Sequence, residues 1–140
     1  MNSLIPPETL EAYRVTHYRV MSETSFILRV GEYSQILRSL HTTAACESSA
    51  FLTAWNPFGE LCTDEVNNAA QRQLIAEIEV RSLAWLSGEG VDPNGTWPGE
   101  PSLLILGISC EEAKRLGVTF KQNALLWMDS RATPELILLR

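Results

Sequence analysis

Apolar runs alternate with amphipathic segments along most of the 140-residue chain. Residues 51–55 and 103–108 are almost entirely apolar, which predicts strands that are covered on both faces. Alternating or β-prone runs predict further strands at residues 16–20, 25–30, 123–128 and 136–139. Residues 129–134 are expected to join the last two strands as a hairpin. The two buried strands are therefore predicted at the centre of a sheet, and the last strand at an edge.

Apolar positions at helical spacing predict four helices, at residues 8–14, in the segment after Gly31, at 64–86 and at 111–116. Pro6 and Pro7 open the first, Thr63 and Ser109 cap the third and fourth, and Gly117 ends the fourth. The buried faces predicted for the second and third helices are Tyr33, Ile36, Leu37, Leu40 and Ala44, and Val66, Ala70, Leu74 and Ile78. On a wetter side of the third helix, Glu77 and Arg81 are spaced for an ion pair.

Residues 87–101 are rich in glycine and proline and predict a long loop with a turn at residues 92–95. The order α, β, β, α, β, α, β, α, β, β predicts an α+β fold. We expect a mixed sheet of five to six strands with three to four helices packed on it. A chain of this length predicts one domain, residues 1–140.

Composition and charge narrow the class of protein. With 45% hydrophobic and 20% charged residues, the chain is typical of globular proteins. Its formal net charge of −6 argues against non-specific binding of nucleic acids. Three cysteines without C-x-x-C spacing predict reduced thiols rather than disulfides or zinc. The absence of a signal peptide or a membrane span predicts a cytoplasmic protein.

Three stretches place polar groups beside apolar strands: residues 50–60, 97–102 and 120–124. The residues that we single out as candidates for ligand binding are Asn56, Asn68, Arg72, Trp97, Glu100, Gln122 and Asn123. Each also has a structural interpretation. Asn56 precedes Pro57, which favours an extended backbone, and its side chain either supports the turn or faces a ligand. Asn68 and Arg72 share one helix face, which lines either a polar pocket or solvent.

These stretches, with "TAWNP" at residues 53–57, "W-x-x-EPS" at 97–102 and "F-x-QNA" at 120–124, resemble a bacterial domain-of-unknown-function family, number 3293. The resemblance runs from about Tyr18 to the end of the chain. Lys121 stands where the family has glycine. The resemblance implies a fold and a polar patch and brings no established activity.

No catalytic constellation stands out. Glu100, between Gly99 and Pro101, either accepts hydrogen bonds from backbone N–H groups or Arg72, which is the favoured structural interpretation, or acts as a general base. Aromatic residues beside the polar groups, Trp55, Phe58, Trp97 and Phe120, form either core plugs, which we favour, or the wall of a pocket for a planar ligand. His17 and His41 lie outside the three stretches. No cofactor and no metal site is predicted.

Three hypotheses follow for the function. The first is a non-catalytic binding or regulatory module with a polar, aromatic-walled pocket. The second is a small enzyme acting on a nucleotide-like or amide-bearing ligand, with Glu100 as base and Arg72 as charge clamp. The third is a protein-interaction partner that pairs through the exposed last strand. The expected partner is thus a small molecule or a protein.

Strand direction decides whether the three stretches form one site. A right-handed crossover through the fourth helix makes the Leu103 and Ala124 strands parallel, so that Glu100 and Gln122 share one end of the sheet. Asn56 joins them only if the Phe51 strand runs antiparallel to both. We expect this arrangement, because the long connection over residues 87–101 can span the sheet again. Asn56, Asn68, Arg72, Glu100 and Gln122 are then predicted to converge.

Overall fold

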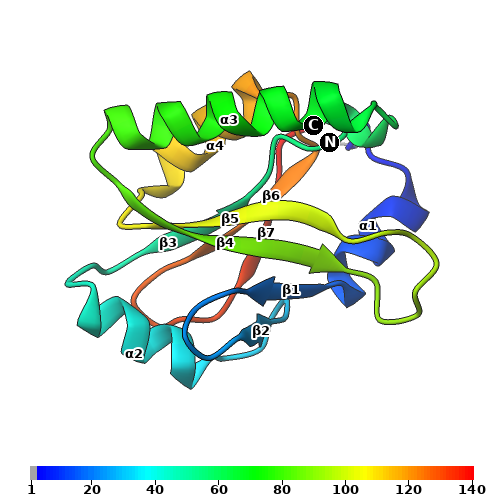
Figure 1. The fold of residues 1–140 in the computed structure, drawn as a ribbon. Helices are drawn as coiled ribbons and strands as arrows, with labels where there is room; N and C mark the ends of the chain where they lie inside the picture. The colour runs from blue at the N-terminus through cyan, green and yellow to red at the C-terminus, as the bar shows by residue number, and fades with distance from the viewer. Residues whose placement is uncertain (1–2) are drawn as a thin grey trace.

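The computed structural model describes residues 3–140, and these residues form four α-helices and one seven-stranded sheet (Figure 1). The helices are α1 (Pro7–Val15), α2 (Gln35–Thr43), α3 (Asp64–Val80) and α4 (Cys110–Thr119), with a short 3-10 helix η1 (Pro57–Gly59). The strands are β1 (His17–Val20), β2 (Phe26–Leu28), β3 (Ser49–Leu52), β4 (Ala84–Val91), β5 (Glu100–Leu106), β6 (Ala124–Met128) and β7 (Glu135–Leu138). The α+β class is confirmed, with one or two more strands than expected.

The strand order is β2-β1-β4-β5-β3-β6-β7, and every neighbouring pair is antiparallel. The prediction of a mixed sheet is therefore wrong. The strands joined by α3 and those joined by α4 do run the same way, but one antiparallel strand is inserted between the members of each of these two pairs. β5 separates β3 from β4, and β3 separates β5 from β6. This interleaving of two split βαβ units is the ferredoxin-like βαββαβ arrangement. The hairpin β1–β2 extends it at one side and β7 at the other.

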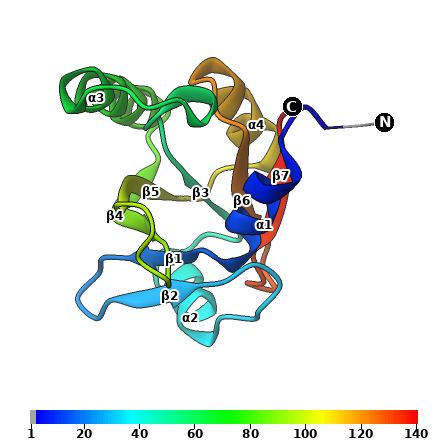
Figure 2. The ribbon, with the colours of Figure 1, turned by 90° about the vertical axis from the view of Figure 1, so that its right-hand side faces the viewer.

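The sheet curls, and each of its faces has its own apolar core. α3 and α4 cover the outer face, where Leu74 and Ile78 of α3 meet the sheet. Figure 2 shows these helices on one side of the sheet, with the β1–β2 hairpin and α2 folded beneath the other side. The core on the inner face, opposite α3 and α4, includes Phe51, Leu104 and Leu126 of the sheet and Leu37 of α2. We call it the inner core. The inner face is thus enclosed by the curl of the sheet itself.

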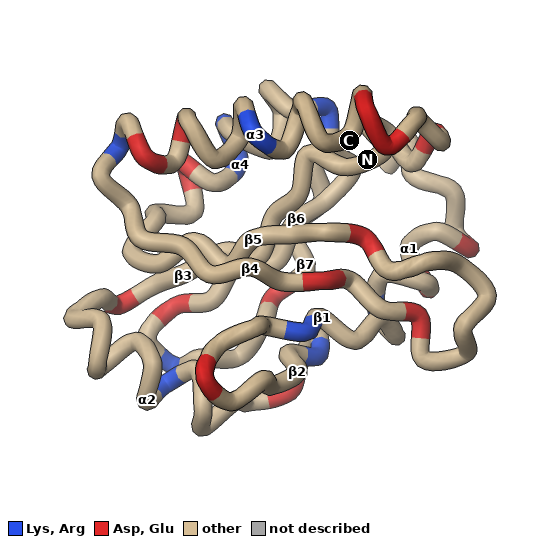
Figure 3. The backbone as a smooth tube through the Cα atoms, in the orientation of Figure 1, with Lys and Arg blue, Asp and Glu red and all other residues tan. Residues whose placement is uncertain are grey.

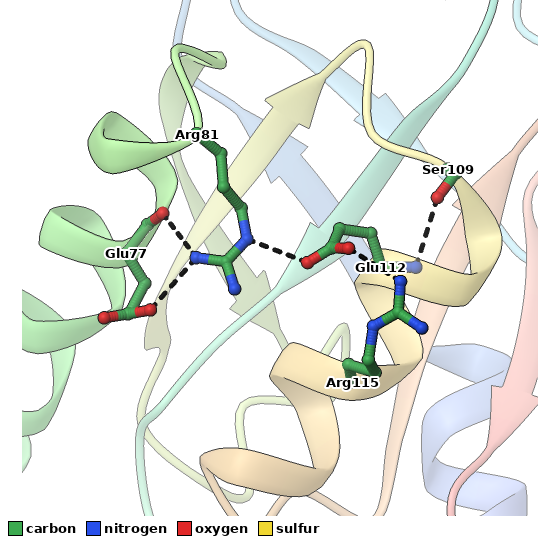
Figure 4. A network of polar contacts seen from close by, with 5 residues as sticks. All are labelled: Glu77, Arg81, Ser109, Glu112 and Arg115. Carbon is green, nitrogen blue, oxygen red and sulfur yellow. Dashed lines mark hydrogen bonds and ion pairs between the residues drawn. The ribbon is translucent and has the colours of Figure 1, made fainter.

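A chain of ion pairs ties the two outer helices together (Figure 4). The Arg81 guanidinium donates to the carboxylate of Glu77, at 3.0 Å, and to that of Glu112 on α4, at 2.8 Å. Glu112 also accepts from Arg115, at 2.7 Å. The predicted pair of Glu77 and Arg81 is confirmed, and the two predicted caps, Thr63 and Ser109, each accept a backbone N–H hydrogen bond at their helix.

The third predicted helix is too long, because residues 84–91 form β4 instead of the helix end and the start of a loop. The helix ends through Ser82, whose φ of 58° is left-handed, at a site that has neither glycine nor proline as a stop signal. Gly88, which suggested a loop, lies in this strand. A Cβ atom there would lie 2.7 Å from the Phe51 ring, so the absence of a side chain lets that ring pack against the backbone of β4.

Two helix faces differ from their predictions, and one helix end does too. α2 buries Leu37 and His41, whereas Ile36 is 52% exposed. α3 buries Asn67, Gln71, Leu74 and Ile78, whereas Val66 is 55% exposed. In both helices the predicted buried face included an exposed apolar residue, Ile36 or Val66, that lies one position before a buried one. α4 continues through Gly117 to Thr119. Gly117 therefore does not end the helix, and its lack of a side chain makes room for Leu139.

Candidate ligand-binding site

The strand directions gather the three polar stretches at one end of the sheet, which we call the open end. β3 runs antiparallel to both β5 and β6, with Leu52 opposite Leu103 and Phe51 opposite Leu126. The residues after β3 therefore lie beside those before β5 and β6. The start of the chain adds α1 to this end, where the Ser3 hydroxyl donates to the carbonyl of Arg140 at 2.7 Å.

The open end encloses a cavity of about 470 Å³. Six aromatic side chains line it: Tyr13, Tyr18, Phe51, Trp55, Phe58 and Trp97. The polar and charged groups that line it include Thr53, Asn56, Glu100, Ser102, Gln122, Asn123 and Arg140. A volume of this size lies within the range of small-molecule pockets, which are mostly apolar with a few polar groups.

The turn after β3 brings Asn56 to the cavity in a left-handed conformation, with φ of 46°. The expected extended backbone before Pro57 is therefore wrong. Asn67 of α3 holds the turn, since its side chain accepts from the Asn56 N–H at 2.9 Å and donates to Asn56 Oδ1 at 2.8 Å. Phe58 is also left-handed, and its N–H donates to the Lys121 carbonyl at 2.7 Å. Backbone strain of this kind concentrates at functional sites.

Glu100 opens β5 and supplies a carboxyl group to the cavity. Burial raises the pKa of this carboxyl above its usual range, and a hydrogen bond from the Asn56 side chain offsets part of the increase. Asn56 and Glu100 both line the cavity at this end of the sheet, as the strand directions predict. The Arg72 partner considered for Glu100 is wrong, because Arg72 is exposed on α3 and does not line the cavity.

The side chain of Asn123 links two groups around the cavity. Its Nδ2 donates to the Tyr13 hydroxyl at 3.1 Å, and its Oδ1 accepts from the Arg140 guanidinium at 3.0 Å. That guanidinium lies 4.1 Å from the centroid of the Phe58 ring, in a cation–π contact. Burial raises the pKa of the Tyr13 hydroxyl, which therefore stays protonated as a hydrogen-bond donor at neutral pH.

Two further candidates, Gln122 and Trp97, are placed by their own local structure. Gln122 Nε2 donates to the carbonyls of Trp55 and Phe120, at 3.3 and 3.2 Å, so its amide braces the turn beside the cavity. Trp97 follows the predicted turn, in which the Asp92 carboxylate accepts the N–H of Asn94 at 2.9 Å. A hydrogen bond from the Thr96 hydroxyl, together with the one from the Asn94 N–H, lowers the pKa of Asp92.

Asn68 and Arg72 do not converge on the site, since both are exposed on α3. Their neighbours Asn67 and Gln71 are buried and hold the end of β3. Gln71 accepts from the Ala54 N–H at 2.9 Å and donates to the Pro101 carbonyl at 3.1 Å. The spacing of Asn67 and Gln71 with Leu74 gave the correct helix face, but the apolar Val66 outweighed it.

Three site residues lay outside the stretches that the sequence singled out: Tyr13, Tyr18 and Arg140. The Tyr18 hydroxyl donates to the Tyr13 carbonyl at 2.6 Å, which fixes α1 across the cavity. The signal in the sequence was weak, because Tyr13 and Tyr18 each fit the apolar face of a short element. Arg140 is more than a hundred residues from Tyr13 in the chain, and no local pattern joins them.

The described residues carry neither a metal-binding cluster nor a membrane span. Within residues 3–140, no group of three or more His, Cys, Asp and Glu side chains is arranged to hold a metal ion. None of the helices in the same range has both the length and the apolar character needed to cross a membrane.

The fold and site define a small α+β protein with a cavity between a ferredoxin-like core and its added N- and C-terminal elements. The chain belongs to the family described as "Protein of unknown function (DUF3293)", whose model matches residues 52–125. No curated protein and no solved structure matches it.

The matched segment is narrower than the expected range from Tyr18 onward. It spans the helices and strands from the end of β3 to the start of β6, and all three polar stretches lie in it, apart from the two residues before Leu52. Tyr13, Tyr18 and Arg140 lie outside the match and add a second wall to the cavity.

Proposed function

We propose that this protein is a non-catalytic binding or regulatory module that holds a small organic ligand at the open end of its sheet. The observation that carries the proposal is the cavity of about 470 Å³, with aromatic walls and a few fixed polar groups. The walls come from α1, from loops and strands of the core, and from the end of the chain. Because segments far apart in the chain form the walls, we expect ligand binding to depend on the folded state of the whole chain.

The enzyme alternative has less support. Glu100 has the raised pKa that a general base needs, but Arg72, the proposed charge clamp, lies outside the cavity. Gln122 and Asn123 cannot transfer protons at neutral pH. The edge-strand alternative is favoured only by the position of β7 at the end of the sheet order. The cavity therefore supports binding of a small molecule best.

The surface charge supports the expectation that nucleic acids do not bind non-specifically. Figure 3 shows acidic and basic positions interspersed along the backbone. The formal net charge is −6. We also propose a cytoplasmic location, which the free thiols of Cys46, Cys62 and Cys110 support.

The four tryptophans provide a direct test of the binding site. Trp55 and Trp97 line the cavity, whereas Trp85 and Trp127 pack against the outer core. In NMR titrations with a library of small fragments, ligands in the cavity should shift the indole N–H resonances of Trp55 and Trp97 first. Trp97→Leu should weaken binding about tenfold, and Tyr33→Leu on the exposed surface should not. A broad library that leaves Trp55 and Trp97 unshifted at millimolar concentration would contradict the proposal.

A further inference from the structure

The cavity contains an acidic group whose charge lacks a basic partner. Seven ion pairs connect side chains within residues 3–140, and Glu100 belongs to none of them. Its side chain is partly buried, and the neutral Asn56 amide beside it does not neutralise a carboxylate. An ionised carboxylate in such a place is costly unless a positive charge or several hydrogen-bond donors compensate it. A bound ligand can supply that compensation.

The basic group of the cavity is already occupied. The Arg140 guanidinium donates to Asn123 and lies over the Phe58 ring, and it forms no ion pair with Glu100. Arg140 is exposed, whereas Glu100 is partly buried. The cavity is thus polarised, with its acid inside and its base in contact with solvent.

Aromatic rings surround the acid. Tyr13 and Tyr18 line the same cavity as Glu100. Trp97 lines the same cavity. Faces of aromatic rings attract organic cations, and a carboxylate among them adds a direct counter-charge. The same walls offer little to an anion, which Glu100 would repel.

We propose that the ligand of this pocket is a small organic cation, whose ammonium, amidinium or guanidinium group binds Glu100 between the rings of Tyr13, Tyr18 and Trp97. This inference rests on the proposed binding function and specifies the class of ligand. A single positive charge fits best, because Arg140 disfavours a second one in the same cavity. The ligand supplies the positive charge that the protein itself does not place beside this carboxylate.

Three probes of nearly the same shape and different charge test the inference: benzamidine, benzamide and benzoate. Each is titrated into the full chain while the indole resonances of Trp55 and Trp97 are followed. Benzamidine should bind with a Kd on the order of 1 mM, as expected for a fragment of this size. Benzamide and benzoate should bind at least about tenfold more weakly, because hydrogen bonds to charged groups are the stronger ones.

Glu100→Gln should weaken benzamidine at least tenfold and leave benzamide nearly unchanged, since it removes the charge and keeps the shape. Glu79→Gln, an equal change of charge on the exposed face of α3, should leave both affinities unchanged. A dispersed NMR spectrum of each variant, with unshifted Trp85 and Trp127 resonances, establishes that it is folded. Lowering the pH should weaken benzamidine binding to the unmodified protein as Glu100 is protonated.

Equal binding of benzamide or benzoate, or benzamidine binding that survives Glu100→Gln, overturns the cationic ligand. So does a failure of all three probes to bind. The proposed binding function is judged separately by the broad fragment library. If neutral or anionic fragments shift Trp55 and Trp97, the pocket binds ligands and only their assigned class is wrong.

Discussion

The two ends of the curled sheet each bury an ionisable side chain, and they treat it differently. At the open end, Glu100 faces a cavity. At the opposite end, which we call the closed end, His41 of α2 is only 3% exposed and its Nε2 lies 2.7 Å from the hydroxyl of the buried Ser49. Its Nδ1 has no hydrogen-bond partner within residues 3–140.

Burial displaces the pKa of both groups toward the neutral form, so the shift alone does not separate a site from a packed core. The space around each group does. Leu37 and Met128 are among the fully buried side chains of the inner core at the closed end. At the open end, six aromatic side chains surround a volume that a ligand can occupy. We therefore interpret His41 as a structural residue and Glu100 as a binding residue.

The largest expected effect is the loss of packing at the closed end. Leu37→Ala removes a fully buried side chain and should lower the free energy of unfolding by about 2–5 kcal/mol in urea denaturation. Ile36→Ala, on the adjacent and half-exposed position of α2, should cost less than about 1 kcal/mol. Equal costs for the two changes would show that the buried face of α2 is misassigned.

The next effect concerns the scaffold of the open end. Gln71→Ala removes the hydrogen bonds to the Ala54 N–H and the Pro101 carbonyl. Because the buried Ala54 N–H loses its partner, the change should destabilise the protein by about 1–3 kcal/mol and weaken the binding of any ligand in the cavity. Gln73→Ala, an exposed glutamine on the same helix, is the control and should be nearly neutral. A neutral Gln71→Ala would contradict the role of α3 in holding the end of β3.

The closed end should also respond to acid. Burial lowers the pKa of His41, and the charge of nearby Asp129 opposes this in part. As the pH falls, the unfolded chain, with an ordinary histidine pKa of about 6.5, binds the proton before the folded protein does. The contribution of neutral His41 to the free energy of unfolding is therefore fully present above that pH. It is lost as the pH falls further, by at most about 1.4 kcal/mol per pH unit.

His41→Gln should flatten this acid-side slope in denaturation curves measured between pH 7 and pH 5 (roughly the window in which an ordinary histidine titrates). His17→Gln removes the other histidine of the chain and provides the comparison. A slope that His41→Gln leaves unchanged, or that disappears only in His17→Gln, would assign the acid sensitivity elsewhere.

Much of the fold could be predicted from local patterns, because apolar runs and caps are local signals. The antiparallel direction of β3 relative to β5 was also predicted, but for the wrong reason. The connection that was interpreted as a long loop contains β4, which pairs with β5 as a hairpin. Nothing local ends α3, since Ser82 adopts its left-handed backbone without a glycine.

The site was predicted in part. Asn56, Glu100 and Asn123 stand beside strong strand signals, and strand direction alone brings them together. Tyr13 and Arg140 were missed because only the tertiary structure joins the two termini. Lys121 shows what the family resemblance adds: its φ of 56° is a conformation that favours glycine, the residue that the resemblance has at this position.

The central claim is that the Glu100 carboxylate is kept for a ligand and not for the fold, and its effect on stability tests this most directly. The raised pKa means that the unfolded chain releases this proton first as the pH rises above about 4.3. The free energy of unfolding of the unliganded protein should therefore fall as the pH rises from this value to the pKa of Glu100 in the folded protein, and then stay constant.

The measurement is the free energy of unfolding of Glu100→Gln and of the control Glu79→Gln, in urea, between pH 4 and pH 7, a window that begins near the ordinary glutamate pKa of about 4.3. We predict that Glu100→Gln gains stability over the unmodified protein as the pH rises through this window, because the variant has no carboxyl group to ionise. The control should show no such gain. A Glu100→Gln variant that is less stable at neutral pH would show that the carboxylate supports the fold and would contradict the account.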